Sequence, residues 1–189
     1  DPIPEELAAK MHKMIAIIQF KVEGQTIMNH PEFKLDHRLM LDKINFDDGT
    51  VNCYGEVYPI KDTNLPTIDP ADPYKLSPEE EEVMVALEAS ITNSKKLQEH
   101  INFLYTHGAL FTTYNGNLLF HGCIPFTEDG DFMEVTIAGK TNHGAGLMRQ
   151  LDQELREVYF NPRCDLDKAD AANLMWYLWL GPDSPLFGK

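Results

Sequence analysis

The chain has 189 residues and a formal net charge of −14, and it is 43% hydrophobic and 24% charged. These proportions are ordinary for a globular protein, and the length is enough to bury one sizeable core. The acidic balance argues against nucleic acid as a partner, because phosphate binding requires clustered Lys and Arg. A membrane partner is not expected either, since the sequence has no run of 18 apolar residues.

The three cysteines, Cys53, Cys123 and Cys164, lie far apart and form no CxxC pair. A disulfide framework or a structural zinc site is therefore not expected, and the reducing cytoplasm is the simplest location. Cys123 is either a reactive thiol or a small buried apolar residue, and burial is the commoner role of such a cysteine.

The N-terminal part is predicted to be a helix followed by a hairpin and a long loop. Residues 4–28 carry apolar side chains at helical spacing, and the middle of this helix is apolar nearly all round, so we expect it to be buried. A β-hairpin over residues 43–46 and 50–58 follows, around the turn Asp47-Asp48-Gly49. Residues 61–75 then form an extended Pro-rich loop.

The next helix is predicted to start at Ser77-Pro78-Glu79-Glu80, with Ser77 as N-cap and Glu80 completing a capping box. It extends to about residue 106, with a kink or break at Asn93-Ser94. Its expected core positions are Met84, Leu87, Ile91, Ile101 and Leu104. A small basic cluster on it either holds a phosphate or is a solvated face paired with Glu99; its members are Lys95, Lys96 and His100.

Residues 115–125 predict a tight turn, a short strand and a histidine at the strand's carboxyl end. Asn115-Gly116 is the strongest two-residue hairpin pattern, and it joins strands predicted over residues 109–113 and 118–120. The second strand is a continuous apolar run, so we expect both of its faces to be covered. His121 then precedes Gly122, where a ligand or another backbone can approach closely. These residues alone leave His121 as either a core histidine or a functional one.

The remainder is predicted to contain an acidic turn over residues 127–131, a strand over 132–137, and helices over 146–159 and 166–180. The aromatic tail of the last helix is expected in the core. Gly139-Lys140 either approaches a phosphate or forms a surface turn. The sequence contains no nucleophile elbow, phosphate loop, dinucleotide fingerprint or HExxH motif. His121 is therefore the one candidate metal ligand, and a single histidine is not a metal site.

Several long strings in this sequence are similar to those of one bacterial enzyme family. The strings run from Met11-His12-Lys13 to Gly24-Gln25, from Pro66-Thr67-Ile68-Asp69-Pro70 to Pro73-Tyr74, from Lys96-Leu97-Gln98-Glu99-His100 to Phe103-Leu104-Tyr105, over residues 115–125, and over residues 176–181 followed by 184–189. Together they resemble the class III fructose-1,6-bisphosphatases over essentially the whole chain. The resemblance implies a metal-dependent phosphoric monoester hydrolase of gluconeogenesis and carbohydrate metabolism. In that family a metal-activated water releases the 1-phosphate of fructose 1,6-bisphosphate, usually with manganese.

That family is similar to the calcineurin-like metallophosphoesterases, whose core is a β-sandwich flanked by helices. The resemblance implies an α+β fold that is one structural unit. In it, residues 1–108 are a largely helical insertion with a β-hairpin, and residues 109–189 are part of the metallophosphoesterase core. Phe120-His121-Gly122 corresponds to the superfamily's His-Gly motif, which implies that His121 is a metal ligand. Leu178-Trp179 followed by Asp183-Ser184-Pro185 resembles the segment before the final metal-binding motif.

The other metal-binding motifs of the family do not occur in the sequence. The resemblance places Asp-x-His, Gly-Asp-x-x-Asp and Gly-Asn-His-Asp/Glu before Asp1, and Gly-His-Thr-Pro after Lys189. We therefore expect this chain to be an internal segment that is inactive by itself. Two alternatives stay open: a non-catalytic scaffold or regulatory domain, and a phosphatase of another sugar phosphate. An oligomer is possible, and no sugar-binding residue or effector site is assigned.

Overall fold

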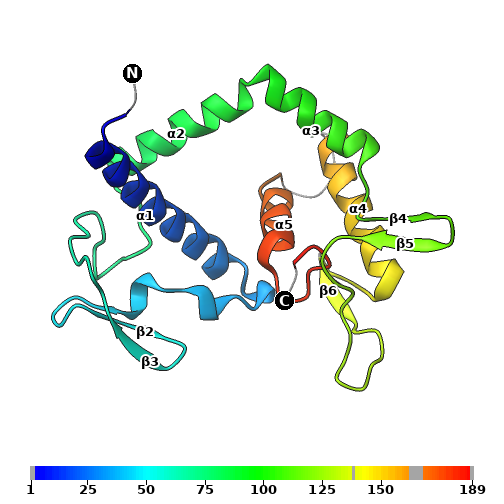
Figure 1. Cartoon of the computed structure of the whole chain (residues 1–189), viewed down its shortest axis with the longest axis horizontal. Helices are drawn as coiled ribbons and strands as arrows, with labels where there is room; N and C mark the ends of the chain where they lie inside the picture. The colour runs from blue at the N-terminus through cyan, green and yellow to red at the C-terminus, as the bar shows by residue number, and fades with distance from the viewer. Residues whose placement is uncertain (1–2, 138, 162–167, 188–189) are drawn as a thin grey trace. The chain divides into compact units, whose positions relative to one another are not determined.

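The computed structural model describes residues 3–137, 139–161 and 168–187. Helices and small antiparallel sheets alternate along these residues (Figure 1), which confirms the α+β class. The chain divides into two compact units, Asp1–Ile91 and Thr92–Lys189, and each is described here by itself. The calcineurin-like sandwich, and the roles of residues 1–108 as insertion and 109–189 as core, stay predictions.

Unit 1 begins with the predicted helix, α1, which spans Glu5–Asn29. The expected burial of its middle is only partly confirmed. Ile17 and Ile18 are buried, but Met14 and Ile15 are 39% and 40% exposed and Phe20 is 44% exposed. The reason is that the apolar cluster of this unit contacts one side of α1 from Ile17 onward, so an apolar surface nearly all round does not produce burial all round.

Three short 3₁₀ turns, Pro31–Phe33, Asp36–Arg38 and Leu41–Lys43, lead into an antiparallel sheet. Its strands are β1 (Ile44–Asn45), β2 (Thr50–Cys53) and β3 (Glu56–Pro59), in the order β1-β2-β3. The prediction of one strand over residues 50–58 is wrong. The chain turns back at Tyr54 and Gly55, whose φ angles are 54° and 86°, and a positive φ is rare enough for tyrosine to hide this turn in the sequence.

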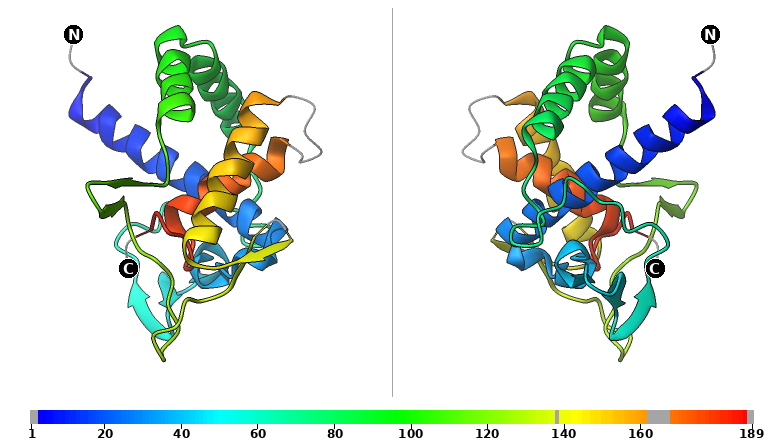
Figure 2. Two further views of the ribbon diagram at one scale, coloured as in Figure 1. Left: turned by 90° about the vertical axis from the view of Figure 1, so that its right-hand side faces the viewer. Right: turned by 90° about the vertical axis from the view of Figure 1, so that its left-hand side faces the viewer.

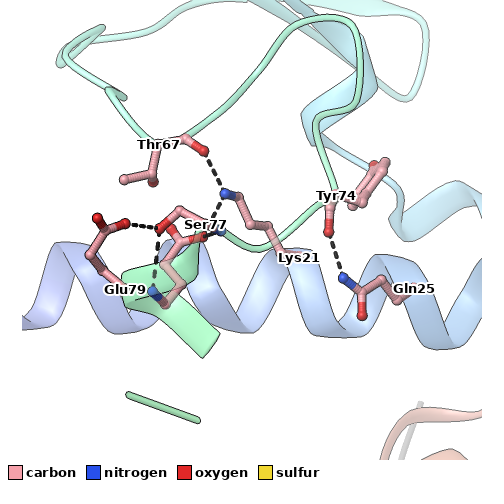
Figure 3. A network of polar contacts seen from close by, with 7 residues as sticks. Lys21, Gln25, Thr67, Tyr74, Ser77 and Glu79 are labelled. Carbon is pink, nitrogen blue, oxygen red and sulfur yellow. Dashed lines mark hydrogen bonds and ion pairs between the residues drawn. The ribbon is translucent and has the colours of Figure 1, made fainter. Parts of the chain in front are cut away.

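The Pro-rich loop packs against α1 through its backbone carbonyl groups (Figure 3). The Lys21 ammonium donates a hydrogen bond to the Thr67 carbonyl oxygen at 2.5 Å, and the Gln25 amide donates to the Tyr74 carbonyl oxygen at 2.7 Å. Lys21 is fully buried. Its charge is balanced by Glu80, whose Oε2 lies 2.7 Å from the Lys21 Nζ and which is itself 3% exposed. The loop therefore connects α1 to the start of the next helix.

That helix, α2, spans Pro78–Thr92, and its predicted capping box is confirmed. The Glu80 amide donates to Ser77 Oγ at 3.3 Å, and the Ser77 amide donates to Glu80 Oε2 at 2.8 Å. Burial by itself would raise the pKa of the Glu80 carboxyl, but hydrogen bonds from Lys21, Thr67 and Ser77 outweigh burial and lower it. One carboxylate thus completes the cap and neutralises the buried lysine.

Tyr74 is the largest side chain that the loop contributes to the core of unit 1. Its ring lies directly on α1 at Gly24, where an added Cβ atom would be 2.0 Å from Tyr74 Cδ1. Its hydroxyl donates to Asp42 Oδ1 at 2.5 Å and accepts from the Leu41 amide at 3.2 Å. Burial, followed by the hydrogen bond to Asp42, raises the pKa of Tyr74 to about 12. The core cluster around it comprises Ile17, Leu41, Ile68 and Tyr74.

The break predicted at Asn93-Ser94 is confirmed, because a new helix, α3, spans Lys95–His107 with Ser94 as its N-cap. The core positions predicted for this stretch are mostly wrong, since Leu87, Ile91 and Leu104 are 41%, 52% and 64% exposed. Helical spacing identifies an apolar face, but it does not identify what, if anything, covers that face.

Unit 2 contains α3, two hairpins and two further helices. Strands β4 (Phe111–Tyr114) and β5 (Asn117–Phe120) form one hairpin, and β6 (Val135–Ile137) and β7 (Lys140–Asn142) form the other. Helix α4 spans Gly144–Phe160 and helix α5 spans Lys168–Leu180; the two are in contact, and they overlap in both views of Figure 2. Residues 166–167, at the predicted start of the last helix, lie outside the described residues.

The core of unit 2 is built around α4. Of the apolar side that helical spacing predicts for residues 146–159, Leu147, Leu151 and Leu155 are buried and Val158 is half-buried. The aromatic tail of α5 is only partly in the core, since Tyr177 is 4% exposed and Trp179 is 77% exposed. The other buried apolar residues of the unit include Val135, Ile137, Met148, Leu174 and Leu178.

Arg156 of α4 connects that helix to the end of α3. Its guanidinium donates to the carbonyl oxygens of Tyr105 and Gly108, and its Nε lies 2.8 Å from Asp152 Oδ2. The Tyr105 ring also stacks on that of Tyr159, with ring centroids 4.1 Å apart. These contacts satisfy carbonyl groups that the C-terminus of a helix otherwise leaves without a partner.

Candidate functional site

The hairpin of β4 and β5 places His121 at the end of a strand, as the sequence predicts. Tyr114 pairs with Asn117, and the turn between them is formed by Asn115 and Gly116 with φ angles of 51° and 75°. Both central residues therefore adopt the left-handed conformation that this turn requires. His121 directly follows β5 and is exposed.

The strand that leads to His121 is not buried, contrary to the prediction from its apolar run. Leu118, Leu119 and Phe120 are 46%, 51% and 42% exposed. The sheet of β4 and β5 has two strands, and no described element covers both of its faces. The run is apolar, but the described structure supplies no second layer against which it could be buried.

Gly122 is held in close contact with the segment that follows α5. Its φ angle is +73°, and an added Cβ atom would lie 2.4 Å from the Pro185 carbonyl oxygen and 2.8 Å from the Leu186 carbonyl carbon. The neighbouring Cys123 amide donates to the same Pro185 oxygen at 3.1 Å. A glycine is therefore required here for two independent reasons, its backbone conformation and the space beside it.

Cys123 continues this contact, and its thiol is half-buried and free. The Sγ atom lies 3.5 Å from the Ser184 carbonyl oxygen and 3.4 Å from that of Phe187. This environment agrees with the structural role favoured for Cys123 from the sequence.

Ser184 fixes the segment against which Gly122 and Cys123 pack. Its side chain is fully buried. The hydroxyl donates to the Leu178 carbonyl oxygen at 2.7 Å and accepts from the Leu186 amide at 3.1 Å. The last turn of α5 is thus connected through Ser184 to the backbone beside Gly122. Nothing in the sequence predicts this role of Ser184, because a small polar residue between Asp183 and Pro185 is typical of an ordinary turn.

The structure therefore brings together the stretch that the resemblance assigned to metal binding and the one that it placed before the final metal-binding motif. Phe120-His121-Gly122 and the segment around Asp183-Ser184-Pro185 lie 60 or more residues apart in the sequence, as the contact between Cys123 and Ser184 (61 residues) illustrates. His121 makes no hydrogen bond or ion pair with any residue that the structure describes. An exposed imidazole beside a packed backbone junction is free to accept a metal ion.

The other candidate residues from the sequence are engaged in ion pairs or in hydrogen bonds of a turn. Lys95 faces Glu99 at 3.9 Å on an exposed helix surface, which agrees with the solvated alternative for the basic cluster. Asp48 accepts hydrogen bonds from Asn45 and Thr50 within its turn, so it serves turn formation. Lys140 contacts Glu154, with Nζ and Oε1 3.2 Å apart.

Among residues 3–137, 139–161 and 168–187, no group of three or more His, Cys, Asp and Glu side chains gathers as a metal-binding cluster. The same residues contain no helix that is both long enough and apolar enough to cross a bilayer. His121 as a metal ligand stays a prediction.

Comparison with known proteins identifies the family. The chain matches the family described as Firmicute fructose-1,6-bisphosphatase over residues 3–189, and it belongs to that family. It is 54% identical over 189 residues to fructose-1,6-bisphosphatase class 3 of Clostridium tetani, and 51% identical over 183 residues to the protein of the same name from Clostridium novyi. These matches cover 100% and 97% of this chain and 28% of each relative. No solved structure matches the chain.

Proposed function

We propose that this chain is part of a metal-dependent fructose-1,6-bisphosphatase, in which His121 binds one metal ion. The observation that carries the proposal is family membership over residues 3–189 combined with an exposed, unpartnered histidine at the end of β5. The reaction is hydrolysis of the 1-phosphate of fructose 1,6-bisphosphate in gluconeogenesis. The relatives are named for that sugar bisphosphate, which supports it as the small-molecule substrate.

The described residues fit one ligand of a metal site and not the whole of it. His121 supplies a single imidazole, and no cluster of three or more potential ligands accompanies it among the described residues. The chain spans 28% of the length of the curated relatives it matches, so the proposal assigns the remaining ligands to other parts of the full-length protein. Manganese is the metal proposed from the resemblance, and imidazole also suits zinc or iron.

Bound metal ions would lower the pKa of the attacking water and neutralise charge on the phosphoryl oxygens. The contribution of this chain is positional. His121 would hold its ion through a neutral ring nitrogen. Gly122 allows the strand end to approach the Pro185–Leu186 backbone, and the buried Ser184 hydroxyl holds that backbone in place. The histidine is thereby placed beside the backbone segment that follows α5.

The proposal includes a calcineurin-like core to which residues 109–189 contribute, with residues 1–108 as an insertion beside it. It also includes a cytoplasmic location. Support for the location comes from Cys53 and Cys123, both of which are free thiols.

The proposal is tested with the full-length protein and its His121→Ala variant. We expect the variant to lose bound manganese and most of kcat while keeping its far-UV circular dichroism spectrum. The loss should exceed roughly 10–100-fold, the usual effect of removing a group that only supports a ligand. Metal content by mass spectrometry and phosphate release, with and without added manganese, measure the two effects.

His100→Ala, which removes an exposed histidine on α3, is the matched control and should retain both metal and activity. Unchanged metal content and turnover in His121→Ala would make His121 a structural residue. A panel of sugar phosphates separates the alternatives. If the protein prefers another sugar phosphate, that compound is its substrate. If it hydrolyses none of them, a scaffold or regulatory domain is favoured.

A further inference from the structure

A cavity in unit 2, lined by polar and charged residues, lies between β7 and α4, apart from the residues around His121. Its volume is about 380 Å³, within the range of small-molecule sites. Lys140 and Asn142 line it from β7, and Arg149, Gln150 and Glu154 line it from α4. Gln150 and Glu154 are 8% and 4% exposed and form its buried floor, whereas Lys140 and Arg149 are exposed.

The floor of the cavity is an ordered chain of hydrogen bonds. The Asn142 amide donates to Gln150 Oε1 at 2.6 Å. The Gln150 amide donates in turn to the Ile137 carbonyl oxygen at 3.0 Å and to Glu154 Oε1 at 3.1 Å. Lys140 Nζ approaches the same Glu154 Oε1 at 3.2 Å. Both amide hydrogens of Gln150 are therefore used, and Gln150 and Lys140 contact the same oxygen of the Glu154 carboxylate, Oε1.

The other oxygen of that carboxylate has no partner. Glu154 Oε2 is buried and makes no hydrogen bond with any residue that the structure describes. A buried acceptor without a donor costs about 1–3 kcal/mol, and more when it is charged. Glu154 lines the cavity, so a turn of its carboxylate would present this oxygen to a ligand there, and a hydroxyl group is a suitable donor.

Arg149 provides a second, complementary group. Its guanidinium lies 5.8 Å from the centre of the Phe111 ring, and the structure assigns it no ion pair among the residues described. Lys140, in contrast, is paired with Glu154. A guanidinium that lies near an aromatic ring and forms no ion pair with a described residue is well suited to bind a phosphate.

We propose that this cavity binds a small hydroxylated phosphate, with a hydroxyl group donating to Glu154 Oε2 and the phosphate accepting from Arg149. A hexose monophosphate has this chemistry. A divalent cation is a poorer occupant, because the described residues around the cavity gather no three potential ligands and Lys140 already lies against Glu154. The proposal does not depend on the hydrolytic function, since none of the residues that carry it belongs to the His121 site.

The test is isothermal titration calorimetry of the full-length protein after metal removal with EDTA, so that no hydrolysis occurs. The ligands are glucose 6-phosphate, glucose and inorganic phosphate. We expect glucose 6-phosphate to bind more tightly than either of its parts. Arg149→Met should weaken its binding at least about tenfold and weaken phosphate binding as well. Glu154→Gln should weaken the binding of glucose 6-phosphate at least about tenfold and leave the binding of inorganic phosphate unchanged.

The matched controls are Lys95→Met and Glu99→Gln, which remove one charge of each sign from the exposed surface of α3. Both should bind glucose 6-phosphate as the unmodified protein does. Arg149 is exposed, so its variant tests the proposal even if the buried Glu154→Gln variant does not fold. No binding of glucose 6-phosphate at about 10 mM would overturn the proposal. It would also be overturned if Arg149→Met bound normally while His121→Ala lost binding, because the ligand would then lie at the His121 site.

Discussion

Gly122 meets two requirements at once, a left-handed backbone and the absence of a side chain beside Pro185. Gly116, in the turn of the same hairpin, meets only the first. Its φ angle is +75°, close to the +73° of Gly122, and no atom lies within 4 Å of an added Cβ. The two glycines therefore separate the cost of backbone strain from the cost of losing a packed contact.

We expect Gly116→Ala to lower the free energy of unfolding by about 1–2 kcal/mol, the cost of a left-handed non-glycine residue. Gly122→Ala should cost a further 1–3 kcal/mol or so, because its Cβ atom would meet backbone rather than a flexible side chain. Urea denaturation of both variants measures the difference. Equal losses would mean that the contact with Pro185 and Leu186 is not important for stability.

Lys21 and Glu80 are buried with their charges facing each other, an arrangement that is stable only as a pair. Removing one partner leaves a charge in the core without its counter-ion, so we expect Lys21→Met to destabilise the chain by about 3–5 kcal/mol. The double variant Lys21→Met with Glu80→Leu should be less destabilised than Lys21→Met alone, since no unpaired charge remains. Urea denaturation of the two variants decides this, and a double variant that is the less stable of the two would contradict it.

At the scale of elements, the end of α3 depends on a residue of another helix. Arg156 of α4 donates to the carbonyl oxygens of Tyr105 and Gly108. We expect Arg156→Met to destabilise the chain by about 1.5–3 kcal/mol, the value of hydrogen bonds from a charged donor. Hydrogen exchange should also become faster at the Gly108 amide, which bonds to Leu104 at the end of α3.

Arg156→Lys is the matched variant. It keeps the positive charge, but an ammonium group lacks the planar array of donors with which the guanidinium reaches two carbonyl groups and Asp152 at once. It should behave more like Arg156→Met than like the unmodified chain. Full protection of the Gly108 amide in both variants would show that the stack of Tyr105 on Tyr159 holds α3 by itself.

For the whole molecule, acid sensitivity follows from Glu80. The pKa of its carboxyl is lower in the folded chain than the ordinary value of 4.5, so its ionised form stabilises the fold. This stabilisation is fully present above about pH 4.5 and is lost as the pH falls through the lower folded pKa. Between about pH 5 and pH 3, Glu80→Gln should therefore lose less stability than the unmodified chain.

The measurement is the urea midpoint across that pH range, and other carboxylates contribute to both proteins alike. Glu99→Gln, an exposed change on α3, is the control and should follow the unmodified chain. Parallel pH profiles for Glu80→Gln and the unmodified chain would show that Glu80 contributes nothing to acid sensitivity.

Features that are encoded within a few residues could be predicted from the sequence. The capping box of Ser77 and Glu80, the break at Asn93-Ser94 and the turn at Asn115-Gly116 each depend on neighbours in the chain. The position of His121 at a strand end follows from that turn. Its metal role came from resemblance, and the described structure shows one unpartnered histidine there and no further ligand cluster.

Burial and long-range contacts could not be predicted in the same way. The run at Leu118 is apolar, but its exposure depends on which other parts of the protein cover it. Lys21 can be buried because a carboxylate 59 residues away in the sequence pairs with it, and no residue close to Lys21 in the sequence predicts that partner. Ser184 is likewise recognisable only once the end of α5 is seen beside Gly122.

The contact between Gly24 and Tyr74 has an evolutionary consequence. With the ring where it is, any side chain at position 24 would overlap it, since even a methyl carbon would lie 2.0 Å from the ring. Substitutions at positions 24 and 74 should therefore covary. A descendant that gains a side chain at position 24 is expected to carry a smaller residue at position 74, and to lose the tyrosine hydroxyl that now bonds to Asp42 and the Leu41 amide. One substitution in the helix thus commits the loop to a second one.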